Sequence, residues 1–219
     1  SHGREIDKHD VVFRFGQAPA GEPYADHVGS TTHFRILGNT AFKTMSHVVQ
    51  MQQTGEQHEV APEVDNATLI LYRCSADDVE SRFEELWRSL AKRPQKQKVT
   101  IMDKRFFLHA AGVLDAFLSC GAVRYQKKTH FVNERASSYP SAELVLTLGA
   151  MHLCKHVSVY GVAERQSSFV RHHAKYYQSS PLSESQPPEV ERLLLTALAD
   201  AGLLRHCSWE GCRGKTLRG

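Results

Sequence analysis

The chain of 219 residues lacks long apolar runs and blocks of one charge sign. No stretch approaches the roughly 20 apolar residues that a membrane-spanning helix needs, and no signal segment precedes the first motif. Its formal net charge of +3 is too small to indicate a nucleic-acid partner. With 41% hydrophobic residues the chain can build one sizeable core, so we expect a single domain over residues 1–219.

Cysteines are few, and their number is odd. The five are Cys74, Cys120, Cys154, Cys207 and Cys212. At least one thiol therefore has no intrachain partner, and Cys207 and Cys212 either pair with each other or stay free. None of the 13 histidines stands in a His-Glu-x-x-His frame, and there is no Cys-x-x-Cys. The pattern predicts neither a metal site nor a cofactor.

Short apolar runs alternate with segments of helical period. The runs predict strands at residues 11–15, 32–37, 68–72, 98–102 and 157–160, and the periodic segments predict helices at 77–92, 105–117, 141–154 and 189–204. Strands separated by helices are typical of a three-layer α/β domain with a largely parallel sheet. In such sheets ligands bind beyond the carboxyl ends of the strands.

Two segments carry residues suited to bind a phosphate at that edge. The first contains Ile6, Asp7, Asp10, Val12, Arg14, Ala18, Pro19, Asp26, Thr31 and Thr32. The second contains Pro140, Ser141, Ala150, Cys154, Val157, Tyr160 and Gly161. Ser141 after Pro140 is typical of a helix start, and a helix start offers N–H groups to an anion.

These segments resemble two motifs of glycosyltransferase family 29, the eukaryotic-type sialyltransferases. The first is similar to the large sialylmotif, Ile-Asp-x-x-Asp-x-Val-x-Arg-x-Asn-x-Ala-Pro, which continues after a spacer with Asp-Val-Gly-x-x-Thr-Thr. The second is similar to the small sialylmotif, Pro-Ser-Thr-Gly followed by a helix, Cys-x-x-Val and Tyr-Gly-Phe. Two long motifs in the family's order are more specific than either motif alone.

The resemblance implies a Rossmann-like variant GT-A domain that transfers sialic acid from CMP-sialic acid to an acceptor glycan on glycoprotein or glycolipid. It implies inversion at the anomeric carbon, no metal, and a type II membrane protein of the Golgi lumen. The membrane anchor, the first strand, a phosphate loop and the cysteine partner of Cys154 would all lie upstream of Ser1. We therefore expect a fragment truncated at its amino end, while the acceptor stays unassigned.

By position, the resemblance places donor contacts at Gly16, Ser141, Ala142 and Glu143. Three of them differ from the family, because Gly16 stands for Asn, Ala142 for Thr and Glu143 for Gly. A side-chain amide and a hydroxyl are lost, and a carboxylate beside a phosphate is unfavourable unless it turns away. The alternative role of Ser141 is that of a plain helix cap.

Two shorter family motifs complete the expected site. Motif III, His-Tyr-aromatic-Glu, is most similar to the stretch that begins at Lys175 and Tyr176. Either Lys175 or one of the upstream residues His172 and His173 would supply the cation that meets the phosphate. The alternative is that Tyr176 and Tyr177 only cover the sheet edge.

The very small motif, His-x-x-x-x-Glu, supplies the base that takes the acceptor's proton. No His stands in this frame, since the frame before Glu189 begins at Glu184 and the frame before Glu191 begins at Gln186. Glu184 is the candidate base, with His172 and His173 as further catalytic candidates, although a carboxylate is a weaker base than His near neutral pH. Alternatively, Glu184 is a solvated loop acid.

The changed contact residues leave two functions open. One is a sialyltransferase, or a transferase that uses another CMP-activated sugar such as Kdo. The other is a catalytically impaired relative that binds nucleotide, glycan or a partner protein without turnover.

Overall fold

The computed structural model describes residues 1–16, 18–38, 67–72, 98–124, 140–161, 189–208 and 211–214. They fall into two compact units, Ser1–Met102 and Asp103–Gly219. Each unit is described by itself, and the single domain predicted over residues 1–219 stays a prediction. The helix predicted at residues 77–92 lies outside the described residues.

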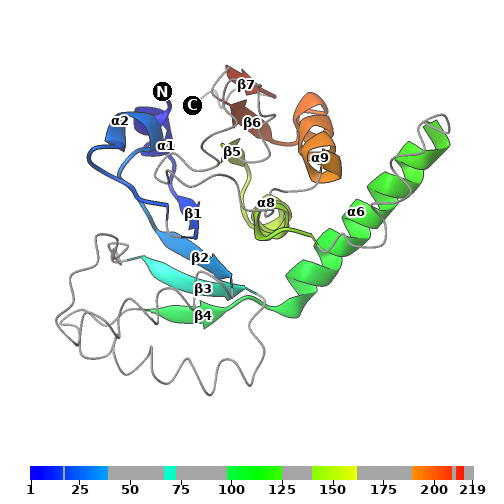
Figure 1. Cartoon of the computed structure of the whole chain (residues 1–219), viewed down its shortest axis with the longest axis horizontal. Helices are drawn as coiled ribbons and strands as arrows, with labels where there is room; N and C mark the ends of the chain where they lie inside the picture. The colour runs from blue at the N-terminus through cyan, green and yellow to red at the C-terminus, as the bar shows by residue number, and fades with distance from the viewer. Residues whose placement is uncertain are drawn as a thin grey trace. The chain divides into compact units, whose positions relative to one another are not determined.

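The first unit is built on an all-parallel sheet of four strands (Figure 1). In order across the sheet these are β1 (Phe13–Phe15), β2 (Phe34–Gly38), β3 (Thr68–Tyr72) and β4 (Val99–Ile101). Each neighbouring pair is parallel, and Phe13 lies opposite Phe34 with the two rings stacked at 4.9 Å. The predicted α/β class with a parallel sheet is confirmed, and all four strands overlap the predicted runs.

The core of this unit lies along β2 and β3. Ile36, Leu37, Leu69 and Leu71 are buried. Successive strand residues point to opposite faces, so the burial of both Ile36 and Leu37 means that both faces of β2 are covered. Cover on both faces fits the apolar residues of β2, which only the buried Arg35 interrupts. Two short helices that pack against each other, α1 (Gly3–Ile6) and α2 (Ala25–Val28), flank β1 in the chain.

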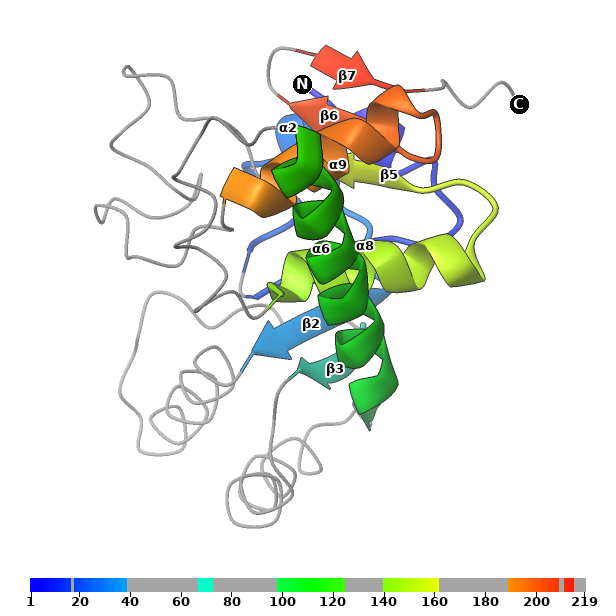
Figure 2. The same ribbon diagram turned by 90° about the vertical axis from the view of Figure 1, so that its right-hand side faces the viewer.

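In its described residues, the second unit combines three helices with a small mixed sheet. The helices are α6 (Lys104–Arg124), α8 (Ala142–Leu153) and α9 (Glu189–Asp200), and α6 packs against both others (Figure 2). The strands β5 (Ser158–Tyr160), β6 (Arg205–Ser208) and β7 (Gly211–Arg213) follow that order in the sheet. β5 and β6 are parallel, whereas β6 and β7 are antiparallel.

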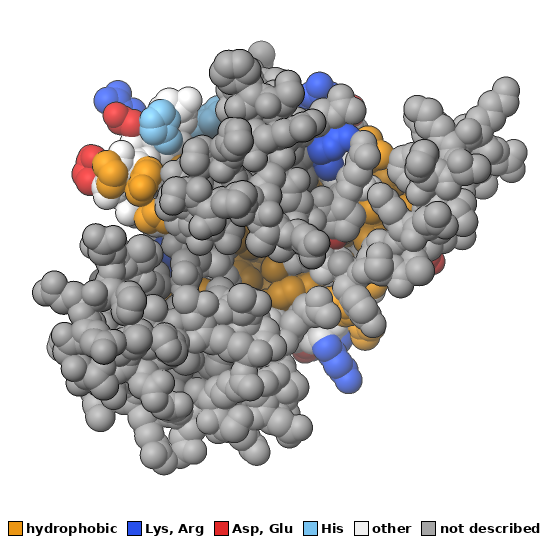
Figure 3. All heavy atoms as spheres, viewed as in Figure 1, with side chains coloured by type: hydrophobic (Ala, Val, Ile, Leu, Met, Phe, Trp, Pro, Cys, Tyr) orange, Lys and Arg blue, Asp and Glu red, His pale blue; other side chains and the backbone are white. Residues whose placement is uncertain are grey.

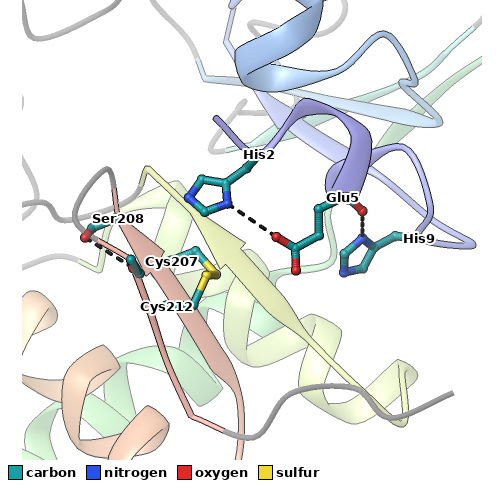
Figure 4. The surroundings of a disulfide bond; sticks show 7 residues. His2, Glu5, His9, Cys207, Ser208 and Cys212 are labelled. Atoms are coloured by element: carbon teal, nitrogen blue, oxygen red, sulfur yellow. Dashed lines mark hydrogen bonds and ion pairs between the residues drawn. A yellow bond between two sulfur atoms is a disulfide. The ribbon is translucent and has the colours of Figure 1, made fainter.

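The strands β6 and β7 were not predicted, because their residues are mostly polar and give no apolar run. A disulfide between Cys207 and Cys212 joins them (Figure 4), which decides between the two alternatives for these cysteines. Cys120 and Cys154 are free thiols. The pairing of Cys154 with an upstream cysteine remains an expectation from the family resemblance.

The described surface is mixed in charge. Around α1 and α2, acidic, basic and histidine side chains lie beside one another (Figure 3). None of the helices within the described ranges is both long and apolar enough to cross a bilayer.

Candidate functional site

The large motif is held together by a carboxylate at its start. Asp7, at the end of α1, accepts hydrogen bonds from the backbone N–H groups of Ser30 and Thr31 at 2.8 to 2.9 Å. Desolvation acts to raise the pKa of Asp7, but the hydrogen bonds from Thr31 and Ser30 and the charge of Arg14 outweigh it, so the pKa is lowered. The ionised form of Asp7 is therefore part of the fold.

Arg14 donates hydrogen bonds to the same segment, whereas Asp7 accepts them. Its guanidinium donates to the carbonyl oxygens of Val28 and Thr31 and to the hydroxyl of Thr32, at 2.7 to 3.1 Å. The side chain is 8% exposed. Asp7 and Arg14 thus satisfy backbone donors and acceptors of one loop, and both motif residues are structural in this unit.

Two histidines add local contacts at α1 (Figure 4). His9 Nδ1 lies 3.0 Å from the backbone carbonyl oxygen of Glu5, and His2 Nδ1 lies 3.3 Å from the carboxylate of Glu5. These contacts join residues on both sides of α1 to Glu5 within the helix.

Gly16 follows β1 at the carboxyl edge of the sheet, where the family is expected to hold its donor. Its backbone is left-handed with φ of +57°, which glycine favours and asparagine tolerates. A Cβ added there would have no neighbour within 4 Å. Arg35, which is 2% exposed, donates to the carbonyl oxygens of Gly16 and Ala18 at 3.0 and 2.8 Å and so fixes the loop. The position therefore has room for the family's Asn, but this chain offers no side chain there.

The small-motif residues Ser141, Ala142 and Glu143 stand at the amino end of α8. Ser141 is the N-cap, because its hydroxyl accepts a hydrogen bond from the backbone N–H of Leu144 at 3.1 Å. Ala142 and Glu143 form the first turn, whose N–H groups have no carbonyl partner within a helix. The cap role considered for Ser141 is thus confirmed, and the donor role stays a prediction.

Glu191 on α9 reaches the same helix start. Its carboxylate accepts from the backbone N–H of Ser141 at 2.8 Å and from the Ser141 hydroxyl at 2.5 Å. Glu191 is 1% exposed. Both hydrogen-bond donors of Ser141 are consequently used within the protein.

Burial raises the pKa of the Glu191 carboxyl above its usual value. The two hydrogen bonds from Ser141 act in the opposite direction, and the nearby negative charge of Glu143 raises the pKa further. The amino end of α8 thus has two carboxyl groups close to the place where the resemblance puts a phosphate.

The other predicted site residues, Glu184, His172, His173, Lys175 and Tyr176, lie outside the described residues. Gly16 belongs to the first unit, whereas Ser141, Ala142 and Glu143 belong to the second, and each group is characterised only within its own unit.

Sequence reasoning did not identify Glu191 as a partner of the small motif. One signal was available, because Glu191 stands three and four residues before Leu194 and Leu195 and so shares their apolar helix face. A carboxylate on such a face requires buried hydrogen-bond donors. Arg35 was also missed, since a single Arg inside a strand does not reveal which carbonyl groups it holds.

Comparison with known proteins agrees with these motifs. Residues 1–203 match glycosyltransferase family 29 (sialyltransferase). Mouse alpha-N-acetylgalactosaminide alpha-2,6-sialyltransferase 1 is 30% identical over 191 residues, which cover 81% of this chain and 34% of the mouse protein. Sialyltransferase-like protein 1 of Arabidopsis thaliana is 40% identical over 58 residues, 26% of this chain and 11% of the relative.

Sialyltransferase-like protein 5 of Oryza sativa subsp. japonica is 40% identical over 48 residues, 22% of this chain and 10% of the relative. The chain therefore spans about a third of the length of the mouse relative that it matches. The match over residues 1–203 includes both sialylmotifs together with the strands and helices that carry them. The chain belongs to glycosyltransferase family 29, the sialyltransferase family.

Proposed function

We propose that this chain is part of a catalytic domain that transfers sialic acid from CMP-sialic acid to an acceptor glycan. The observation that supports it best is the amino end of α8, which carries the small motif and is fixed by Ser141 and Glu191. We further propose inversion at the anomeric carbon, catalysis without a metal, and residence in the Golgi lumen as a type II membrane protein.

The chemistry needs a site that accepts the leaving nucleotide. The acceptor oxygen forms a bond to the anomeric carbon of sialic acid, the bond from that carbon to the phosphate oxygen breaks, and CMP leaves with a further negative charge. The acceptor's proton passes to a base. Free N–H groups and the positive end of a helix dipole stabilise such a charge without a metal.

In this proposal the phosphate is met by the backbone of α8. Both donors of Ser141 are already bound to Glu191, so the first-turn N–H groups of Ala142 and Glu143 are the donors that remain. The proposal requires that the side chain of Glu143 turn away from the phosphate. From the family resemblance we retain Lys175, Tyr176 and Gly16 as further proposed donor contacts.

For the base we retain Glu184, assisted by His172 or His173. The mouse relative is named for an N-acetylgalactosaminide acceptor and an alpha-2,6 linkage. A glycan that ends in N-acetylgalactosamine is therefore the first acceptor to test, with CMP-Kdo as the alternative donor.

A second function is favoured by Glu191. Glu191, one of the acids considered as the end of the very small motif, is bound to Ser141 of the small motif by two hydrogen bonds. The frame that ends at Glu191 begins at Gln186, and an amide cannot take up a proton. The chain would then be a catalytically impaired relative that binds the nucleotide or a glycan without turnover.

Two measurements on the full-length protein separate these functions. Calorimetry with CMP tests the donor site, and absence of CMP binding would contradict the transferase. Transfer from CMP-sialic acid that is abolished by Glu184→Gln supports the active enzyme with Glu184 as base. CMP binding without transfer, followed by a gain of transfer in Gln186→His, supports the impaired relative.

A further inference from the structure

A pair of histidines bridges α6 and α8 away from the helix start described above. His109 Nε2 and His152 Nε2 lie 2.9 Å apart, and the two rings meet edge to face with centroids separated by 4.6 Å. Both side chains are exposed to solvent. One Nε2 must carry a proton and the other must accept it, so each ring is within reach of a shared ligand.

The helices hold this pair in place through a close contact one turn earlier on each helix. A Cβ on Gly149 would lie 2.9 Å from the ring of Phe106, so α8 approaches α6 more closely there than a side chain allows. His152 and His109 each stand three residues after these two, on the same faces of their helices. The distance between the imidazoles is therefore set by packing and does not depend on a flexible loop.

We propose that His109 and His152 form a binding site for a divalent transition-metal ion such as Zn²⁺ or Ni²⁺. Imidazole nitrogen is a preferred ligand of these ions, in contrast to Mg²⁺ or Ca²⁺. With metal–nitrogen bonds of about 2.0 to 2.1 Å, two nitrogens on one tetrahedral ion lie about 3.3 Å apart. The observed separation of 2.9 Å requires only a small outward rotation of two exposed side chains.

Coordination replaces the hydrogen bond between the rings. The proton on the donating Nε2 moves to Nδ1 of the same ring, both Nε2 lone pairs turn to the ion, and the ion loses two of its bound waters. No net charge is lost from the protein when both rings start neutral. Across the described part of the chain no third ligating side chain joins the pair, so water completes the coordination. The bound ion links α6 to α8 and stabilises their contact.

This inference is independent of the proposed transfer reaction and is tested by binding alone. Zn²⁺ is titrated by calorimetry into the metal-free chain, with Ni²⁺ as a second probe and Mg²⁺ as a negative control. We expect His109→Gln and His152→Gln each to weaken the tightest Zn²⁺ site at least about tenfold. The double variant should be little weaker than either single variant, because the two ligands act as a unit.

The matched control is His156→Gln, which removes an exposed histidine of the same unit that stands outside the pair. It should leave Zn²⁺ affinity unchanged. Thermal unfolding with and without Zn²⁺ confirms that the variants fold and that only the wild type and His156→Gln gain a higher Tm. The proposal is overturned if the wild type binds no Zn²⁺, or if its tightest site survives in His109→Gln or His152→Gln.

Discussion

Glu191 and Ser141 form a double hydrogen bond in which one carboxylate takes both donors of one serine. Because Ser141 also caps α8, the position of the helix start depends on a residue from α9 that follows it by 50 positions. The small motif at the start of α8 and Glu191 on α9 are thereby joined by hydrogen bonds within the second unit.

We expect Ser141→Ala to lower the free energy of unfolding by about 2 to 3 kcal/mol. The substitution removes a helix cap and leaves a buried carboxylate oxygen of Glu191 without its hydroxyl partner. Urea denaturation measures the loss. Ser158→Ala is the matched control, since the Ser158 hydroxyl is buried and has no partner within the described ranges. Equal losses in the two variants would contradict a special role for Ser141.

The raised pKa of Glu191 predicts a pH-dependent stability. A carboxyl whose pKa is higher in the folded state contributes stability below its unfolded pKa of about 4.3, and this contribution is lost as the pH rises through the folded value. As the pH rises from 4 toward neutral, the free energy of unfolding of the wild type should therefore fall relative to that of Glu191→Gln. Unfolding curves across that range measure it, and a flat difference would show that Glu191 is not desolvated.

The lowered pKa of Asp7 predicts that its contribution to the free energy of unfolding changes with pH in the opposite direction. Its pKa is lowered in the folded state, so the stability that it contributes is present above about pH 3.9 and is lost as the pH falls through the folded value. Asp7→Asn should cost about 1 kcal/mol at neutral pH, a small value for a charged acceptor because Asp7 is solvent-exposed. The cost should shrink in acid. Acid unfolding of the two proteins tests this, and a constant difference would contradict it.

Gly16→Asn should fold normally and restore a side chain that can bind the donor. The position is left-handed and has space, so the expected stability change is within about 1 kcal/mol. If the donor site is functional, CMP affinity measured by calorimetry should rise. Gly29→Ala is the contrasting variant, because its Cβ would overlap the carboxylate of Asp7, and it should be clearly destabilised. Loss of folding in Gly16→Asn would argue against the local geometry.

Two helical glycines offer a matched pair. In Gly112→Ala on α6, the added Cβ has no other atom within 4 Å. The substitution should raise the free energy of unfolding by up to about 1 kcal/mol, because alanine has the higher helix propensity. Gly149→Ala on α8 gains the same propensity but must displace the ring of Phe106, an overpacking that costs about 1 to 3 kcal/mol. It should therefore be net destabilising. Thermal and urea unfolding of both variants test the pair, and stabilisation of both would disprove the close contact.

The fold could be predicted where local pattern and tertiary context agree. Apolar and β-branched runs identified β1 to β4 within a few residues, although Arg14 and Arg35 interrupt β1 and β2 and β4 is largely exposed. The strands β6 and β7 were missed because Arg205 and His206 carry no such pattern, and their pairing depends on β5 and on a disulfide.

The candidate site could be predicted only in part for a similar reason. Ser141 is recognisable as a cap from its neighbours, whereas its partner Glu191 is distant in sequence and is visible only as an acid on an apolar face. His109 and His152 are separated by 43 residues and form no sequence frame. Both pairs, Ser141 with Glu191 and His109 with His152, form through contacts between helices, and their spacing along the chain does not reveal them.

The loop held by Asp7 and Arg14 has a consequence for how relatives of this chain are judged. Both residues form hydrogen bonds to the backbone of this loop. A relative that no longer transfers a sugar therefore still needs them to fold. Retention of the large motif therefore measures inherited architecture. Whether the chemistry is kept or lost is better judged at positions that the fold does not constrain. Gly16 is one of them, because an asparagine would have open space there.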